Sequence, residues 1–205
     1  MSISITVDSV TRVFSRGAGV TNVSCSAVDH DIVGIAGRNG AGKSTLIKLI
    51  AGALSPASGA VSVSVNGTLI DADDLQNYVG LVGQYLAPYD ESTPRELLEV
   101  TARLRGISWN VDMSTALLDR VKLGHVHDRV AKGFSSGMLQ RLRFAVALQH
   151  KPMLLLLDEP TSNLDEDGVT LVKSIIDDQQ TVGAIFLASN DARELAWCTR
   201  IVRLD

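Results

Sequence analysis

Apolar and polar residues alternate in two parts of the first third of the chain, a pattern that predicts half-buried antiparallel strands. The first two alternating segments cover 3–7 and 23–27, with a Gly-containing turn at 15–19 between them. Alternation returns over 60–70, around an Asn-Gly dipeptide at 66–67 that is typical of tight hairpin turns. We therefore expect a small antiparallel β section near the start of the chain.

Five further segments are short and mainly apolar, as in the buried strands of a parallel sheet. They lie at 32–36, 78–82, 153–157, 184–188 and 201–204. One helical pattern follows the first of them, and another, over 166–180, separates the third from the fourth. Strands that alternate with helices indicate crossover connections and hence a parallel sheet.

The stretch over 93–150 has a mostly helical pattern and no strong strand signal. Pro94 suits the first turn of a helix, whereas Gly106 and Gly124 suit helix ends. This part of the chain therefore predicts a helical insertion between the strands.

A length of 205 residues allows one domain of ordinary size, so we expect a single domain over 1–205. The predicted fold is α/β: a parallel-sheet core with an N-terminal antiparallel section and a helical insertion. We assign the core and the antiparallel section to 1–84 and 151–205, and a helical subdomain to 85–150.

Composition indicates a globular protein without a nucleic-acid partner. Hydrophobic residues make up 45% and charged residues 20%, which suits a packed core. Lys plus Arg number 19 against 23 Asp plus Glu, and the basic residues do not cluster, so no nucleic acid is expected. No apolar run approaches the roughly 18 residues that cross a bilayer, and the first residues lack the pattern of a secretion signal. We expect a cytoplasmic location.

Cysteine and histidine add no candidate site. Cys25 and Cys198 lie far apart and outside any metal-binding motif, so we expect reduced, buried thiols. The four histidines are expected to be solvated or to cap helices. His150 follows a helical stretch, where a cation is mildly favoured.

A phosphate-binding motif follows the strand at 32–36. Its residues match G-x-x-x-x-G-K-[ST] and are Gly37, Arg38, Asn39, Gly40, Ala41, Gly42, Lys43 and Ser44. The glycines let backbone N–H groups surround an anion, and the helix N-terminus adds its dipole. Lys43 can reach the outer phosphates, Ser44 can bind Mg²⁺, and Thr45 can add a phosphate contact. The alternative is a plain Gly-rich turn, which the flanking strand and helix disfavour, so the motif predicts a P-loop NTPase.

Two carboxylates, Asp158 and Glu159, follow the leucine-rich strand at 153–157. Open parallel sheets bind ligands at the carboxyl ends of their strands. Asp158 suits an oxygen ligand or a water-mediated partner of Mg²⁺, and Glu159, on the other side of the chain, suits a base that polarises an attacking water. In isolation the pair would be read as a capping or solvated acidic turn, but Lys43 and Ser44 on the same sheet favour the catalytic interpretation.

With these motifs in this order, the chain resembles a nucleotide-binding domain of the ATP-binding cassette (ABC) family over essentially its whole length. Phe134-Ser135-Ser136-Gly137-Met138, followed by Gln140-Arg141, resembles the family's signature loop, with Phe, Ser and Met where Leu, Gly and Gln are commonest. The resemblance implies a dimer in which Ser135, Ser136 and Gly137 face the terminal phosphate of an ATP held by the other subunit. Locally, the same residues are also explained as a helix N-cap.

Three more positions take their roles from this resemblance. Gln84 matches the family's glutamine loop, which is implied to contact Mg²⁺ and the nucleophilic water; taken alone it is a surface polar residue. Asp165 matches a residue implied to act across the dimer interface, and it also suits a helix N-cap. Phe14 stands where the family places an aromatic against adenine, although a lone aromatic is more often a core residue.

One position departs from the family pattern. Asn190 stands where a histidine usually contacts the terminal phosphate. An asparagine amide can donate a hydrogen bond but cannot become a cation or carry a proton near neutral pH. We therefore hypothesise that basal ATP turnover is slow, while Glu159 preserves catalysis.

The resemblance implies an ATP-binding and ATP-hydrolysing subunit that uses ATP and Mg²⁺, pairs with a second protomer, most simply a copy of itself, and powers a separate transmembrane permease from the inner face of the cell membrane. Its compact form and signature are more similar to the haem exporter ATPases of cytochrome c maturation than to those of nutrient importers. Two alternatives remain open: a soluble family member that acts on DNA or ribosomes, and a slowly hydrolysing ATP-dependent dimerisation switch. A GTPase is disfavoured because no Asn-Lys-x-Asp motif occurs, and a small-molecule kinase would leave 134–141 unexplained.

Overall fold

The structure, a computed structural model, describes residues 1–14, 17–85 and 91–204. Within these ranges the strands form two sheets. The parallel sheet has the order β6 (Val79–Val82), β7 (Leu154–Asp158), β8 (Ala184–Ser189), β3 (Ile32–Ala36), β9 (Arg200–Arg203). The antiparallel sheet has the order β2 (Gly19–Val28), β1 (Ile3–Val13), β4 (Ser58–Val65), β5 (Thr68–Leu69). The α/β fold expected from the sequence, with its parallel core and antiparallel section, is confirmed.

The antiparallel sheet follows the alternating pattern of its sequence. Asn66 and Gly67 both have positive φ angles, 50° and 79°, and close the hairpin between Val65 and Thr68. This geometry needs residues that tolerate left-handed backbone, which is why Asn-Gly marks such turns. The predicted turn at 15–19 includes residues 15 and 16, which lie outside the described residues.

The helices and 3₁₀ helices connect the strands. They are α1 (Lys43–Ile50), α2 (Pro94–Leu104), α3 (Val111–Arg120), α4 (Ser136–Leu148), α5 (Glu166–Gln180) and α6 (Ala192–Leu195), with 3₁₀ helices η1 (Leu75–Asn77), η2 (Gly124–Val126) and η3 (Ala131–Gly133). The division at 84/85 and 150/151 into core and helical subdomain remains a prediction.

Pro94 and Gly106 mark the start and end of α2 as the sequence predicts, whereas Gly124 does not mark the end of α3. Thr93 caps α2 in a capping box with Glu96, and Gly106, at φ 66°, follows its end. The expectation that Gly124 stops a helix is wrong: α3 ends at Arg120 and Gly124 begins η2. A Cβ at Gly124 would come within 1.7 Å of a carboxylate oxygen of Asp119, so that side chain would have to move.

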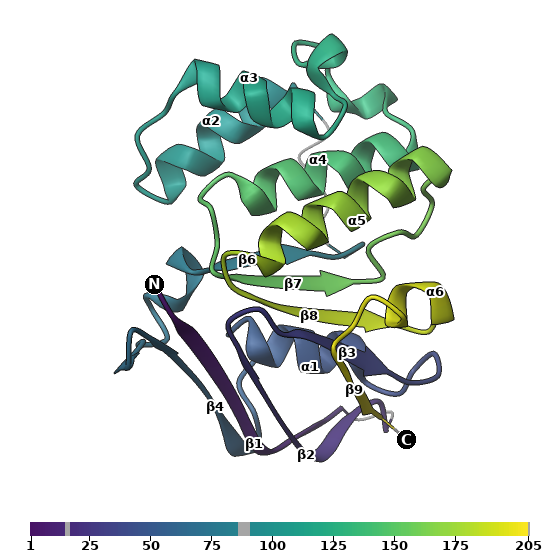
Figure 1. Cartoon of the computed structure of the whole chain (residues 1–205). Helices are drawn as coiled ribbons and strands as arrows, with labels where there is room; N and C mark the ends of the chain where they lie inside the picture. Colours follow the sequence, from purple (N-terminus) through teal and green to yellow (C-terminus); the bar gives the residue numbers. More distant parts are fainter. Residues whose placement is uncertain (15–16, 86–90, 205) are drawn as a thin grey trace.

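Figure 1 shows α1 between the parallel and antiparallel sheets, α4 and α5 on the opposite face of the parallel sheet, and α2 and α3 beyond α4. The parallel sheet is therefore covered on both faces, so its strands are apolar on both sides. In β7, Leu154 and Leu156 belong to the core that contains α1, whereas Leu155 and Leu157 belong to the core under α4 and α5. Each face of β7 is therefore buried in a different hydrophobic cluster.

His150, just after α4, differs from expectation. Its Nε2 lies 3.0 Å from the carbonyl oxygen of Val79 and donates to it, and its Nδ1 is buried without a hydrogen-bond partner among the described residues. Burial, together with the charge of Arg105, lowers the pKa of His150 to about 4, against an opposing effect of the Val79 hydrogen bond. The ring is therefore neutral at pH 7 and does not act as the cationic helix end that the sequence suggested.

Across the described ranges, none of the helices combines the length and the apolar composition that crossing a membrane requires.

Candidate functional site

The phosphate loop, residues 37–44, connects β3 to α1 and leaves the start of that helix open. Gly42 adopts φ 96° at the N-cap, and a Cβ there would lie 2.1 Å from the carbonyl oxygen of Gly19. Glycine is thus required both by the backbone conformation and by the close approach of β2. No side chain of the described residues caps α1, so its first N–H groups are available to an anion.

Lys43 lies within this loop. Its side chain is buried, and Nζ donates to the carbonyl oxygens of Gly37 at 2.9 Å and Arg38 at 3.3 Å. These contacts give Gly37 and Arg38 a role in holding the ammonium group, whereas Ala41 packs inside the loop near Gly37. The loop therefore places a cation directly beneath the open start of α1.

Ser44 and Asp158 meet although they are far apart in the sequence. Asp158 ends β7, is 5% exposed and lies near the Ser44 hydroxyl. Burial raises the pKa of Asp158, and interaction with the Ser44 hydroxyl and the charges of Lys43 and Lys48 oppose that effect. A nearby cation would stabilise the charged form of this buried carboxylate. The carboxylate and the Ser44 hydroxyl together form a set of oxygen ligands that fits Mg²⁺.

Glu159 lines a cavity of about 260 Å³ together with the phosphate loop. The other residues of this wall are Ala18, Gly19, Asn39, Gly40, Gly42, Lys43, Ser44 and Thr45. Glu159 has φ 49°, in the left-handed region, and its N–H donates to the carbonyl oxygen of Ala188 at 2.9 Å. This conformation costs about 1 kcal/mol for a non-glycine residue, and the bond to β8 holds it. Glu159 therefore lines the cavity itself, and the preceding residue, Asp158, lies near Ser44 of its wall.

The position of the expected histidine is also connected to this cavity. Asn190 follows β8, and its Nδ2 donates to Oδ1 of Asn39 at 3.0 Å. Asn39 is one of the residues that line the cavity. Asn190 thus reaches the phosphate loop, as a residue that contacts a terminal phosphate must.

Gln84 leaves the sheet next to these carboxylates. The sheet register pairs Val82 with Leu157, so the loop after β6 starts beside Asp158. Gln84 is exposed, and its carbonyl oxygen lies 3.5 Å from a guanidinium nitrogen of Arg143. Its proposed contact with Mg²⁺ and water remains a prediction.

The signature residues lie outside the cavity of their own chain. Ser135 caps α4 and accepts a hydrogen bond from the N–H of Met138 at 3.2 Å, while Ser136 is also exposed. Gly137 packs near the carbonyl oxygen of Asn163. The local interpretation of Ser135 as a helix N-cap is confirmed, and its hydroxyl stays accessible at the exposed start of the helix.

Asp165 connects the signature helix to α5. It caps α5 by accepting from the N–H of Gly168 at 2.9 Å, and it accepts from Arg141 Nη2 at 3.2 Å. The capping interpretation is confirmed, and the exposed carboxylate remains a candidate for contact with a second subunit.

Phe14 is an exposed aromatic rather than a core residue. Its side chain is 40% exposed, and the Arg12 guanidinium lies 5.4 Å from the centroid of its ring. Ala18 and Gly19 line the cavity at the phosphate loop, but Phe14 is not among the residues that line it. Adenine stacking on Phe14 therefore stays a prediction.

Two buried polar residues near the site could not be found from local sequence. Gln140 is 1% exposed and donates through Nε2 to the carbonyl oxygen of Pro160 at 2.9 Å. Glu194 is 3% exposed and accepts from the N–H of Thr161 at 2.9 Å and from its hydroxyl. Both hold the segment that follows Glu159, and they come from elements remote in sequence, so only the tertiary fold reveals their role.

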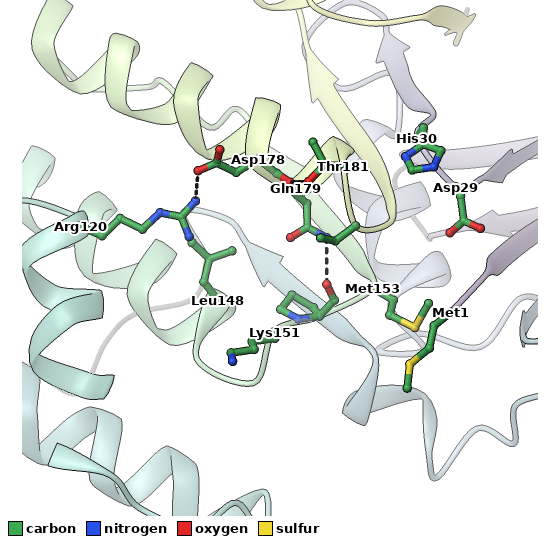
Figure 2. Close-up of a pocket in the computed structure, with 12 residues that line it drawn as sticks. Met1, Asp29, His30, Arg120, Leu148, Lys151, Met153, Asp178, Gln179 and Thr181 are labelled. Carbon is green, nitrogen blue, oxygen red and sulfur yellow. Dashed lines mark hydrogen bonds and ion pairs between the residues drawn. The ribbon is translucent and has the colours of Figure 1, made fainter. Parts of the chain in front are cut away.

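A larger cavity, about 810 Å³, lies at the amino-terminal ends of the parallel strands, where β7 and β8 begin. Figure 2 shows Arg120 paired with Asp178 on one side of it and His30 and Asp29 on the other. None of the predicted site residues lines it. Because open parallel sheets bind ligands at the carboxyl ends of their strands, the smaller cavity is the candidate nucleotide site.

Comparison with known proteins agrees with this geometry. The model of the family described as "ABC transporter" matches residues 20–162. The chain is 32% identical over 176 residues to the bacitracin transport ATP-binding protein BcrA of Bacillus licheniformis, and the matched region covers 86% of this chain and 57% of BcrA. It is 30% identical over 184 residues to the lantibiotic transport ATP-binding protein SrtF of Streptococcus pyogenes, and the matched region covers 90% of this chain and 78% of SrtF. The chain thus spans a little over half the length of BcrA.

Solved structures share the fold. A structure described as the ATP-binding subunit of an ABC transporter superposes with a TM-score of 0.83 at 26% identity, covering 98% of this chain and 85% of that one. A bacterial Atm1-family ABC exporter with ATP bound has a TM-score of 0.84 at 21% identity, over 98% and 37% of the two chains, and supports the fold alone. The chain therefore belongs to the ABC transporter family and has the fold of that family's ATP-binding domains.

Proposed function

We propose that this chain is the ATP-binding and ATP-hydrolysing subunit of an ABC transporter, which works as a nucleotide-sandwich dimer and powers a separate transmembrane permease. The observation that carries the proposal is the convergence of Lys43, Ser44 and Glu159 on one cavity, with the buried Asp158 near the Ser44 hydroxyl. A cation, a hydroxyl and two carboxylates at an open helix start are the groups that phosphoryl transfer from ATP needs.

Each group has a role in this proposal. The N–H groups at the start of α1 and the Lys43 ammonium hold the β- and γ-phosphates, and Thr45 adds a contact from the first turn. Ser44 and Asp158 would hold Mg²⁺, with Gln84 as a further ligand. When bound, the metal neutralises charge on the phosphate oxygens.

Glu159 performs the proton transfer. Its carboxylate faces the cavity and orients a water whose oxygen attacks the γ-phosphorus. As the new bond forms, the bond between the γ-phosphorus and the bridging oxygen breaks, ADP retains the electron pair, and the water proton passes to Glu159. Asn190, held at Asn39, donates a hydrogen bond toward the developing charge but adds no positive charge.

The exposed signature loop supports a dimer. Ser135 and Ser136 are accessible at the start of α4 yet do not line the cavity of their own chain. A second copy that faces this chain can bring the N–H groups of α4 to an ATP held by Lys43, because a helix N-terminus favours an anion. Asp165 lies at the start of α5, which Arg141 ties to α4. In this arrangement ATP joins the two copies, and hydrolysis releases them.

The names of the relatives concern transport of bacitracin and lantibiotics, and we extend to this chain only the class of function: ATP-driven transport with a membrane partner, from the inner face of the membrane. The finer resemblance to haem exporters remains a prediction.

One observation favours a second candidate, a slowly hydrolysing dimerisation switch: the neutral Asn190 at the position of the usual histidine. Phosphate release in a single turnover separates the two.

The enzymatic part of the proposal is tested by steady-state ATP hydrolysis. Glu159→Gln should lower kcat by at least about a hundredfold, because it removes the base and keeps the shape of the side chain. Glu99→Gln is a matched control, since the half-buried Glu99 of α2 pairs with Arg103 and does not line the cavity. Wild-type protein that neither binds nor hydrolyses ATP with Mg²⁺ would overturn the proposal.

The transport part needs a membrane partner. Purification of the tagged chain from detergent-treated membranes should recover a polytopic membrane protein in a fixed ratio. Recovery of ribosomes or DNA in place of a membrane protein would favour the soluble alternative.

A further inference from the structure

Tyr85, the residue after Gln84, contacts the helix that begins at the phosphate loop. Nζ of Lys48, in the last turns of α1, lies 3.9 Å from the centroid of the Tyr85 ring. An ammonium group over an aromatic face is attracted by the ring's negative charge distribution. The loop after β6 is therefore tied to α1 directly beside Gln84.

Gly83 gives the ring the space to fold back over its own loop. A Cβ at this position would come within 2.8 Å of two ring carbons of Tyr85. Space alone, and not a left-handed backbone, favours glycine here. Any larger residue must push the ring, so Gly83, Tyr85 and Lys48 form a single packed unit.

This unit borders the candidate metal site. Burial raises the pKa of the Tyr85 hydroxyl, and the negative charge of Asp158 raises it further. The charge of Lys48 in turn acts on Asp158, where it opposes the effect of burial. The sheet register places the start of the loop next to the same carboxylate, since Val82 pairs with Leu157.

We propose that Tyr85 is a positioning residue: its ring holds the Lys48 ammonium, and this pair fixes the loop that carries Gln84 relative to Asp158. The inference rests on the proposed function, in which Gln84 and Asp158 act on Mg²⁺ and the attacking water. Neither Tyr85 nor Lys48 touches the reacting atoms in this account. Their contact sets where Gln84 stands, so its loss affects the rate more than ATP affinity.

The test compares variants that remove the contact with variants that keep it. Tyr85→Leu and Lys48→Met remove the ring or the cation, whereas Tyr85→Phe and Lys48→Arg preserve an aromatic face and a cation. In the full chain, the first two should lower kcat by about three- to tenfold with less than a twofold change in KM for ATP, and the second two should stay near wild type. The double variant Tyr85→Leu/Lys48→Met should be no slower than either single variant, because the two side chains act as one unit.

A second readout needs neither nucleotide nor metal. Hydrogen exchange of peptides that cover residues 79–85 should be faster in Tyr85→Leu and Lys48→Met than in wild type, and unchanged in the two conservative variants. Gly83→Ala, which only adds a methyl group against the ring, should reproduce Tyr85→Leu and have no further effect in its background.

The outcomes separate the two proposals. Wild-type protein without ATPase activity defeats the proposed function, while the exchange data still test the pair. Active wild type combined with a Tyr85→Leu variant of unchanged kcat and unchanged exchange would overturn the inference. So would strictly additive effects of Tyr85→Leu and Lys48→Met, which would mean that the side chains act separately.

Discussion

At the scale of single residues, Asn190 is the side chain that we expect to limit ATP hydrolysis. Its amide donates to Asn39 at 3.0 Å and so stands at the edge of the phosphate cavity. An amide supplies a hydrogen bond but no charge, whereas a histidine can supply both and titrates near neutral pH. We therefore expect the missing positive charge at Asn190, and not the geometry of the phosphate loop, to limit the rate of hydrolysis.

Replacing Asn190 with histidine should raise kcat about three- to thirtyfold, because an imidazolium stabilises developing negative charge better than an amide. The gain should decline as the pH rises through the range in which the histidine loses its proton. Steady-state hydrolysis between pH 6 and 9 measures both effects. Asn190→Ala, which removes the bond to Asn39, is the companion variant and should be slower than wild type. An Asn190→His variant with unchanged or lower kcat would remove Asn190 as the limiting feature.

At the scale of elements, helix α4 is joined to the segment after Glu159 by a buried side chain. Gln140 donates to the carbonyl oxygen of Pro160 and accepts from Arg143 Nη1 at 2.9 Å. The helix that starts at the signature loop is thus locked to the strand end that carries both carboxylates. We therefore expect a shift of α4 to be transmitted to the segment that follows Glu159.

Gln140→Leu should lower the free energy of unfolding by about 1–3 kcal/mol, since it leaves the buried Pro160 carbonyl without its donor. It should also lower kcat, because the chain after Glu159 loses its support. Thr93→Ala, which removes the cap of the remote helix α2, is the matched control: it should cost about 1 kcal/mol and leave kcat unchanged. Urea unfolding and steady-state kinetics on both variants distinguish the cases. Equal kcat in Gln140→Leu and wild type would show that the connection is only structural.

His150 couples the end of α4 to pH. Its pKa is lowered to about 4 in the folded chain by burial and by the charge of Arg105, so between about pH 6.5 and 4 the unfolded state binds more protons than the folded state. Acid therefore favours unfolding in this window. Between pH 7 and 4.5, the free energy of unfolding should fall by about 1–2 kcal/mol more in wild type than in His150→Gln. This value is reduced for the partial exposure of the ring. Urea unfolding at both pH values measures this, and a constant difference between the two proteins would contradict it.

At the scale of the whole molecule, local pattern was sufficient for the parts of the fold that depend on neighbouring residues. The strand at 32–36 has its predicted bounds, and the hairpin at 66–67 forms as its Asn-Gly dipeptide indicates. The glycine at 124 does not mark the end of a helix, because α3 ends earlier, at Arg120, and Gly124 begins η2. The prediction of a cationic His150 was wrong because burial decides the charge of its ring, and burial depends on packing between distant elements.

The same limit applies to the candidate site. The motif at 37–44 and the carboxylates at 158–159 were evident from residue type and spacing, and the structure brings Ser44 to Asp158. The contacts of Gln140, Glu194 and Tyr85 were not evident, because each is made with an element far away in the chain. Sequence patterns report chemistry that sits on one loop, and the surroundings of that loop require the fold.

The central claim of the account is that Lys43 of one copy and Ser135 of another grip the same ATP. Light scattering coupled to size-exclusion chromatography of Glu159→Gln, with ATP and Mg²⁺, tests it most directly. The account predicts a species of twice the 21.9 kDa chain mass, which reverts to monomer when Ser135→Arg is added to block the start of α4. A Glu159→Gln protein that binds ATP yet remains monomeric, or a dimer that Ser135→Arg does not disturb, would contradict it.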